Sequence, residues 1–66
     1  MKFETVTRRV LAEFDEMPGL TLTPRQAARL FGLEPDLCQR VLDSLIDMAY
    51  LREKGGIVRR GDRIAA

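Results

Sequence analysis

Hydrophobic residues recur every three or four positions through most of this chain and alternate near its end, which predicts helices followed by strands. The first periodic segment covers residues 3–17 and has apolar side chains at Phe3, Val6, Val10, Leu11, Phe14 and Met17. These spacings place most of the apolar side chains on one face of a helix. We expect Glu4 or Thr5 to cap this helix. Pro18-Gly19 should end it, because proline disfavours helical backbone in the residue before it.

The middle of the chain predicts two more helices joined by a tight turn. Thr23 is placed as an N-cap, with Pro24 at the first helical position and Gln26 three residues after the cap, which is the pattern of a capping box. Gly32 should end the first of these helices, because glycine adopts the left-handed backbone conformation without cost. Pro35 fits the first turn of the second helix, where a missing N–H is tolerated.

These two central helices supply most of the predicted core. One face of the first helix gathers Ala27, Leu30 and Phe31, and Ala28 is small enough to let the two helices approach closely. The main apolar stripe of the second helix consists of Cys38, Leu42, Leu45 and Ala49. Leu37, Val41 and Met48 widen this stripe on its flanks. Ile46 lies beside this stripe and should be partly exposed. We expect the Cys38 thiol to be a small buried hydrophobe, since no histidine is present to activate it.

Beyond the central helices the hydrophobic pattern becomes that of strands. Residues 51–60 should form a hairpin in which Gly55-Gly56 supplies the positive backbone angles of a tight turn. A two-residue loop would set Lys54 opposite Ile57 and Arg52 opposite Arg59, whereas a longer loop would change this register. Residues 20–22 alternate as a short extended stretch, and Ile64 in the tail could anchor that tail against the core.

Three short motifs resemble a known family. They are the turn Phe31-Gly32-Leu33, the run Arg40-Val41-Leu42-Asp43-Ser44-Leu45, and the ending Ala49-Tyr50-Leu51 before a charged hairpin. Together they resemble the winged helix-turn-helix DNA-binding domain of small bacterial transcriptional regulators. In that family a Leu-Gly-Leu turn leads into a recognition helix with an Arg-x-Leu-x-x-Leu run, and the hairpin that follows is called the wing.

The resemblance implies a mainly α fold with a small β-hairpin, that is, three helices plus a short antiparallel wing. It implies one winged-helix domain over residues 1–66, with the helix-turn-helix at 23–50 and the wing at 51–60. In this fold the extended stretch at 20–22 pairs with the wing. The same fold also serves as a protein-docking module, so the resemblance alone does not decide the activity.

Composition narrows the class of protein. The chain has 66 residues, of which 45% are hydrophobic and 32% charged, as in a single soluble domain. No apolar run is long enough to cross a bilayer and no signal-peptide pattern opens the sequence, so we expect a cytoplasmic protein without membrane contact. One cysteine excludes an internal disulfide, and the absence of histidine leaves no common zinc site. We expect no metal, no cofactor and no small-molecule ligand.

DNA binding needs cations along the phosphates and polar groups that reach base edges. The candidate contact residues are Arg25 and Arg29 on the first central helix, Gln39 and Arg40 on the second, and Lys54, Arg59 and Arg60 in the hairpin. Glutamine can pair with adenine and arginine with guanine. In the family that this chain resembles, the wing contacts the DNA backbone or minor groove, which is the part implied for the hairpin cations.

Acidic residues on the second central helix oppose this interpretation. That helix and its cap include Glu34, Asp36, Asp43 and Asp47 against Arg40 alone, although the net charge of the whole chain is +1. Carboxylates near phosphates repel them, while Glu or Asp can accept a hydrogen bond from cytosine. In a purely structural alternative, Arg40 pairs with Asp36 or Asp43 on the helix surface.

We therefore expect a DNA-binding transcriptional regulator that acts as a dimer on two half-sites. The alternative is a protein-interaction module in which the acidic second central helix or the first helix docks a partner. An enzyme is not expected, because Ser44 is the single serine, histidine is absent and no glycine-rich phosphate loop occurs.

Overall fold

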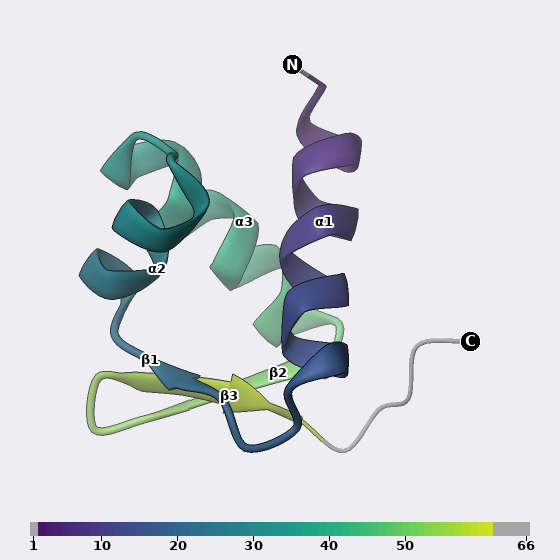
Figure 1. Cartoon of the computed structure of the whole chain (residues 1–66), viewed down its shortest axis with the longest axis vertical. Helices are drawn as coiled ribbons and strands as arrows, with labels where there is room; N and C mark the ends of the chain where they lie inside the picture. The colour runs from purple at the N-terminus through teal and green to yellow at the C-terminus, as the bar shows by residue number, and fades with distance from the viewer. Residues whose placement is uncertain (1, 62–66) are drawn as a thin grey trace.

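The computed structural model describes residues 2–61, and Ile64 lies outside the described residues. Along that range the elements are α1 (Phe3–Glu16), β1 (Thr21–Leu22), α2 (Pro24–Phe31), α3 (Pro35–Asp47), β2 (Leu51–Lys54) and β3 (Ile57–Arg60) (Figure 1). The predicted combination of helices with a short antiparallel wing is confirmed. The sheet has three strands in the order β1-β3-β2, and its pairs are antiparallel.

The register of the sheet agrees with the two-residue loop. Lys54 lies opposite Ile57 and Arg52 opposite Arg59, while Gly55-Gly56 forms the turn with φ values of 60° and 80°. Both angles lie in the left-handed region, which glycine enters without a steric penalty. β1 pairs with β3 on the other side of β3 from β2, so the predicted pairing between the extended stretch and the wing is confirmed.

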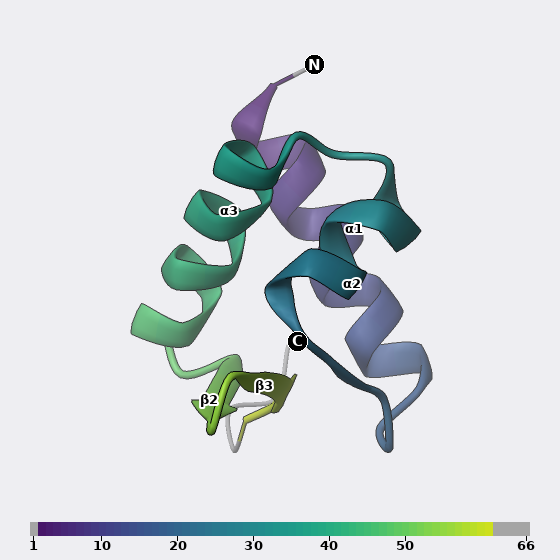
Figure 2. The ribbon, with the colours of Figure 1, turned by 90° about the vertical axis from the view of Figure 1, so that its left-hand side faces the viewer.

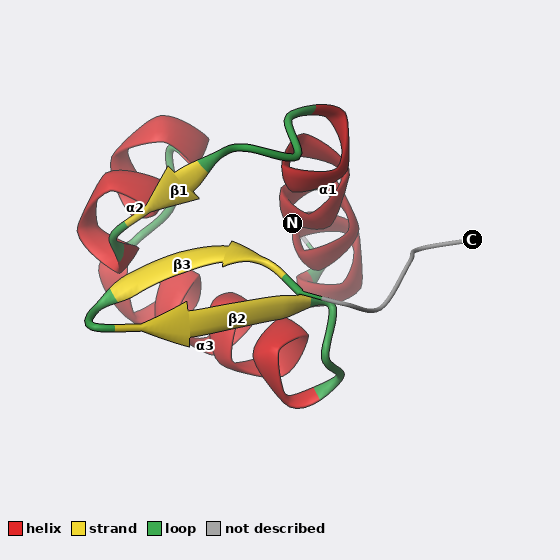
Figure 3. Cartoon of the chain, turned by 90° about the horizontal axis from the view of Figure 1, so that it is seen from below, coloured by secondary structure: helices red, strands yellow, loops and turns green. Residues whose placement is uncertain are grey.

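The helices stand on one face of the sheet. In Figure 1, α1 lies on one side of the molecule, whereas α2 and the turn of the hairpin lie on the opposite side. Seen from below in Figure 3, the hairpin runs beneath α3 and β1 lies beside α2. α3 packs against α1, α2 and β2, so it is the central helix of the domain.

The buried core combines residues from all three helices and the hairpin: Val6, Val10, Phe14, Ala27, Ala28, Phe31, Cys38, Val41, Leu42, Leu45, Leu51 and Val58. Leu30 was predicted to share the buried face of α2, and this prediction is wrong because Leu30 is 58% exposed. At about 100° per residue, Ala27, Ala28 and Phe31 form one continuous stripe, and Leu30 falls outside it. The predicted partial exposure of Ile46 is confirmed.

The start of α2 and its end follow the predicted local signals. Thr23 Oγ1 accepts from the Gln26 backbone N–H at 3.1 Å, and the Thr23 backbone N–H donates to Gln26 Oε1 at 2.9 Å. Gly32 has a φ of 67°, and the Leu33 N–H donates to the Ala28 carbonyl at 2.9 Å. These bonds satisfy backbone groups that a helix end leaves without partners.

The ends of α1 and α3 differ from the predictions. Lys2 is the N-cap of α1 and makes no side-chain cap bond, so Glu4 and Thr5 lie inside the helix rather than capping it. α3 ends at Asp47, which removes Met48 and Ala49 from the predicted apolar stripe and leaves Met48 39% exposed. The chain turns at this point because Leu51 must enter the core at the start of β2.

Ala49 makes this turn in an unusual conformation. Its φ is 66°, and the hydrogen bonds of its own N–H to the Ile46 carbonyl and of the Tyr50 N–H to the Leu45 carbonyl, at 3.0 and 2.9 Å, complete a helix-ending motif that usually contains glycine. Gly61 passes close to this turn, and its N–H donates to the Tyr50 carbonyl at 2.7 Å. A Cβ at Gly61 would lie 2.6 Å from the Ala49 carbonyl oxygen, so only glycine fits there.

Candidate nucleic-acid interface

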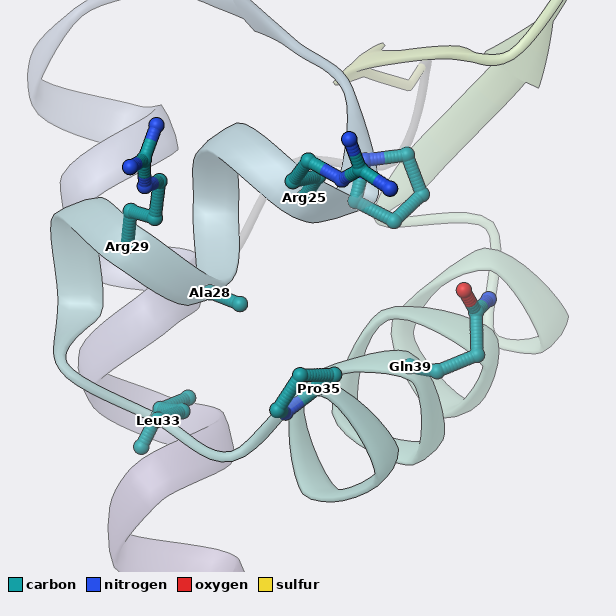
Figure 4. Close-up of a pocket in the computed structure, with 7 residues that line it drawn as sticks. Arg25, Ala28, Arg29, Leu33, Pro35 and Gln39 are labelled. Atoms are coloured by element: carbon teal, nitrogen blue, oxygen red, sulfur yellow. The ribbon is translucent and has the colours of Figure 1, made fainter.

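A groove between α2 and the start of α3 brings together candidate contact residues from both helices. It has a volume of about 460 Å³ and is lined by Pro24, Arg25, Ala28, Arg29, Leu33, Pro35 and Gln39 (Figure 4). The small Ala28 side chain lets the helices approach, and Pro35 starts α3 directly after the turn. Arg25 and Arg29 are exposed and one helical turn apart, so both guanidinium groups are available along the α2 side of this groove.

The hairpin contributes a second group of cations. Leu51 and Val58 are buried, and strand residues alternate between faces, so Arg52, Lys54 and Arg59 lie on the face of the hairpin that points away from the core. These three cations also line a groove of about 470 Å³ between the hairpin and the end of α3. Arg52 was not among the candidate contact residues. The predicted register sets Arg52 opposite Arg59, so the sequence alone could have added Arg52 to the candidate contact residues.

α2, α3 and the hairpin share one side of the molecule. Figure 2 looks onto this side and shows α3 and α2 above the hairpin, with α1 behind them. Five of the seven candidate residues line the two grooves on this surface: Arg25, Arg29, Gln39, Lys54 and Arg59. We call this surface the α2–α3–wing face.

The other two candidate residues, Arg40 and Arg60, are engaged by α1. The Arg60 Nε lies 2.9 Å from Asp15 Oδ1, in an ion pair that ties β3 to α1. The Arg40 guanidinium carbon lies 5.8 Å from the centroid of the Phe3 ring, which is the geometry of a cation–π contact. Within residues 2–61, Arg40 forms no ion pair with Asp36 or Asp43, so the predicted structural alternative is replaced by the contact with Phe3.

The exposed side of α3 is acidic, and α3 packs against both elements that carry the cations, α2 and β2 of the hairpin. Asp36, Asp43 and Asp47 are exposed there. Gln39 on the same side donates through Nε2 to Asp43 Oδ1 at 2.8 Å. The opposite charges expected from the sequence are therefore on separate elements. The carboxylates lie along α3, and the arginine and lysine side chains lie on α2 and the hairpin.

Cys38 is buried and unsuited to nucleophilic chemistry. Cys38 is 1% exposed, and its Sγ lies 3.8 Å from the Pro24 carbonyl oxygen. Burial raises the pKa of the Cys38 thiol, so the thiolate is disfavoured. The prediction of a small buried hydrophobe is confirmed. Among residues 2–61 no three His, Cys, Asp or Glu side chains gather in a way that could hold a metal ion.

Comparisons with known proteins assign this chain to no family. No protein-family model, curated protein or solved structure matches this chain. Within the described range, no helix is both long enough and apolar enough to cross a membrane. The three helices and the small antiparallel sheet are compatible with a winged-helix-like fold.

Proposed function

We propose that this protein is a winged helix-turn-helix transcriptional regulator that binds duplex DNA through the α2–α3–wing face. The observation that supports the proposal most is the placement of cations on the two elements that pack against α3, namely α2 and the hairpin. Arg25 and Arg29 lie on α2, and Lys54 and Arg59 lie on the hairpin. A major groove is about 12 Å wide and admits one helix, with phosphates on both rims.

In this arrangement the cations meet phosphates and α3 meets the bases. Arg25 and Arg29 contact the backbone on one rim of the groove, and the hairpin cations contact the backbone on the other. The carboxylates of α3 then face the base edges, where the amino groups of adenine and cytosine are the donors. This division reconciles an acidic helix with basic neighbouring elements, because in this arrangement the carboxylates lie farther from the phosphates than the arginines do.

An NMR titration with a random-sequence duplex at low salt tests the proposal. We expect shifts in amides at the start of α2, along the exposed side of α3 and in the hairpin, while amides in the first half of α1 stay in place. The shifts should reverse as salt rises, because phosphate contacts release counterions. A poly-aspartate peptide of equal charge is the control for general anion binding. Absence of shifts, or shifts confined to α1, would exclude this mode of binding.

A groove between α1 and the end of α3 favours self-association as a second function. It has a volume of about 270 Å³, and its lining, mainly apolar, includes Phe3, Leu11 and Met48. Phe3 is 38% and Met48 39% exposed. The groove lies on the α1 side, so a second copy bound there leaves the α2–α3–wing face open. Glu4 and Arg8 also line it, one helical turn apart, and a two-fold axis between antiparallel copies of α1 would set each Glu4 against Arg8 of the other copy.

Sedimentation velocity with charge variants tests this dimer. Arg8→Glu should weaken self-association by roughly fivefold, the effect of about 1 kcal/mol, because it places like charges together. Adding Glu4→Arg to that variant should restore the wild-type constant. Arg9→Glu is the matched control, since Arg9 is exposed on α1 and outside the groove. A wild-type chain that remains monomeric at several hundred micromolar would contradict the dimer.

A further inference from the structure

We infer that Gln39, held in orientation by Asp43, reads adenine in the major groove. This inference rests on the proposed function and adds to it the base that the interface selects. Its starting point is a hydrogen bond on the exposed side of α3, in which Gln39 Nε2 donates to Asp43 Oδ1 at 2.8 Å. The two residues are one helical turn apart, so the bond forms without any change in the backbone.

The carboxylate fixes which end of the Gln39 amide faces the groove. An amide oxygen turned toward Asp43 would meet another oxygen and be repelled, whereas the amide nitrogen donates to it. Figure 4 shows the Gln39 oxygen turned toward α2 and the nitrogen turned away from it. The acceptor of Gln39 therefore faces the groove that Arg25 and Arg29 also line.

The groups that remain on Gln39 match one base. A primary amide has two N–H bonds, and Asp43 occupies one of them. The second N–H and Oε1 can form a bidentate pair with adenine, in which Oε1 accepts from N6 and the N–H donates to N7. Guanine presents two acceptors, so its O6 would repel Oε1. Thymine presents O4 and a methyl group, and cytosine offers one donor without the neighbouring acceptor.

The arginine expected to read guanine lies elsewhere. Arg40 stacks on Phe3 on the α1 side of α3, whereas Gln39 lines the groove on the α2 side. Of these two predicted base readers, Gln39 is the one on the α2–α3–wing face. Asp43 adds a negative charge near DNA, which lowers total affinity. We therefore expect Asp43 to improve discrimination between bases rather than total affinity. A residue with a purely electrostatic role would change total affinity alone.

Selection from a randomised duplex pool, followed by sequencing, tests the inference. Wild-type protein should enrich adenine at one position by roughly five- to hundredfold, the usual range for a bidentate base contact. Gln39→Ala should lose this preference, and Gln39→Glu should move it to cytosine because a carboxylate only accepts. Asp43→Ala should reduce the preference while total affinity stays equal or rises. Arg40→Ala is the control, and this variant should retain the preference for adenine.

Replacing the selected adenine with 7-deazaadenine gives a second readout, because the analogue lacks the N7 acceptor. Wild-type affinity should fall about fivefold or more, and the affinity of Gln39→Ala should not change. A pool that is not retained at low salt would overturn the proposed function and this inference together. Retention without enriched adenine, or adenine enrichment that survives Gln39→Ala, would overturn the inference and leave DNA binding intact.

Discussion

Replacing Phe14 with alanine should remove a large share of the stability of the domain. Phe14 is fully buried at 0% exposure, and its ring centroid lies 6.4 Å from that of Phe31. Truncating a buried phenylalanine to alanine costs about 3–5 kcal/mol. A domain of this size has a total stability of roughly 3–10 kcal/mol, at about 0.05–0.15 kcal/mol per residue. Thermal unfolding followed by circular dichroism should show a midpoint lowered by more than about 12 °C, or no transition.

Phe3→Ala is the matched control, because it makes the same chemical change near the other end of α1. Phe3 is 38% exposed, and its ring contacts the Arg40 guanidinium at 5.8 Å. Loss of this contact and of the partial burial should cost about 1 kcal/mol. Equal midpoints for the two variants would mean that Phe14 is not the centre of the core.

Local sequence signals predicted the parts of the fold that depend on a few neighbouring residues. The capping box of Thr23 and Gln26 satisfies backbone groups within four residues, and the glycine pair at 55–56 fixes the register of the hairpin. Gly32 likewise ends α2 without help from distant elements. Each of these signals works through steric or hydrogen-bond requirements that leave few alternatives, so each prediction is confirmed.

Predictions that depended on distant contacts were less successful. In a helix as short as α2, the turn at Gly32 and the packing of α3 decide which of Leu30 and Ala28 is buried. Nothing in its own side chain marks Ala49 for a left-handed conformation, because alanine favours helices. Leu51 and the backbone near Gly61 impose that turn from outside the helix.

In the candidate interface, too, residues placed by local signals could be predicted and residues placed by distant contacts could not. The register of the hairpin places Arg59 and Lys54 on one face, and that register could be predicted from the two glycines. Arg40 and Arg60 could not be placed in this way, because their contacts, Phe3 and Asp15, are in α1. Arg40 is 37 residues from Phe3 and Arg60 is 45 residues from Asp15, too far apart for any helical or strand periodicity to relate them. Only the packing of α1 beside α3 and β3 reveals these contacts.

Removing three cations from the α2–α3–wing face should flatten the salt dependence of DNA binding and weaken affinity strongly. The variant is Arg25→Ala, Lys54→Ala and Arg59→Ala, at exposed positions that frame the face. Each lost phosphate contact reduces the slope of log K against log salt by about 1, so three reduce it by about 3. At 0.1 M salt the affinity should fall roughly a hundred- to thousandfold. Fluorescence anisotropy with a labelled duplex at several salt concentrations measures both quantities.

A second triple variant separates contacts at this face from general attraction to a cation. Lys2→Ala, Arg8→Ala and Arg9→Ala lower the net charge from +1 to −2, the same change as in the first variant, since each variant removes three positive charges. These cations belong to α1 or to its N-cap, so they lie outside the proposed interface. We expect the control to change the slope by less than about 1. Equal flattening in both variants would mean that DNA contacts no particular face, because only total charge would then matter.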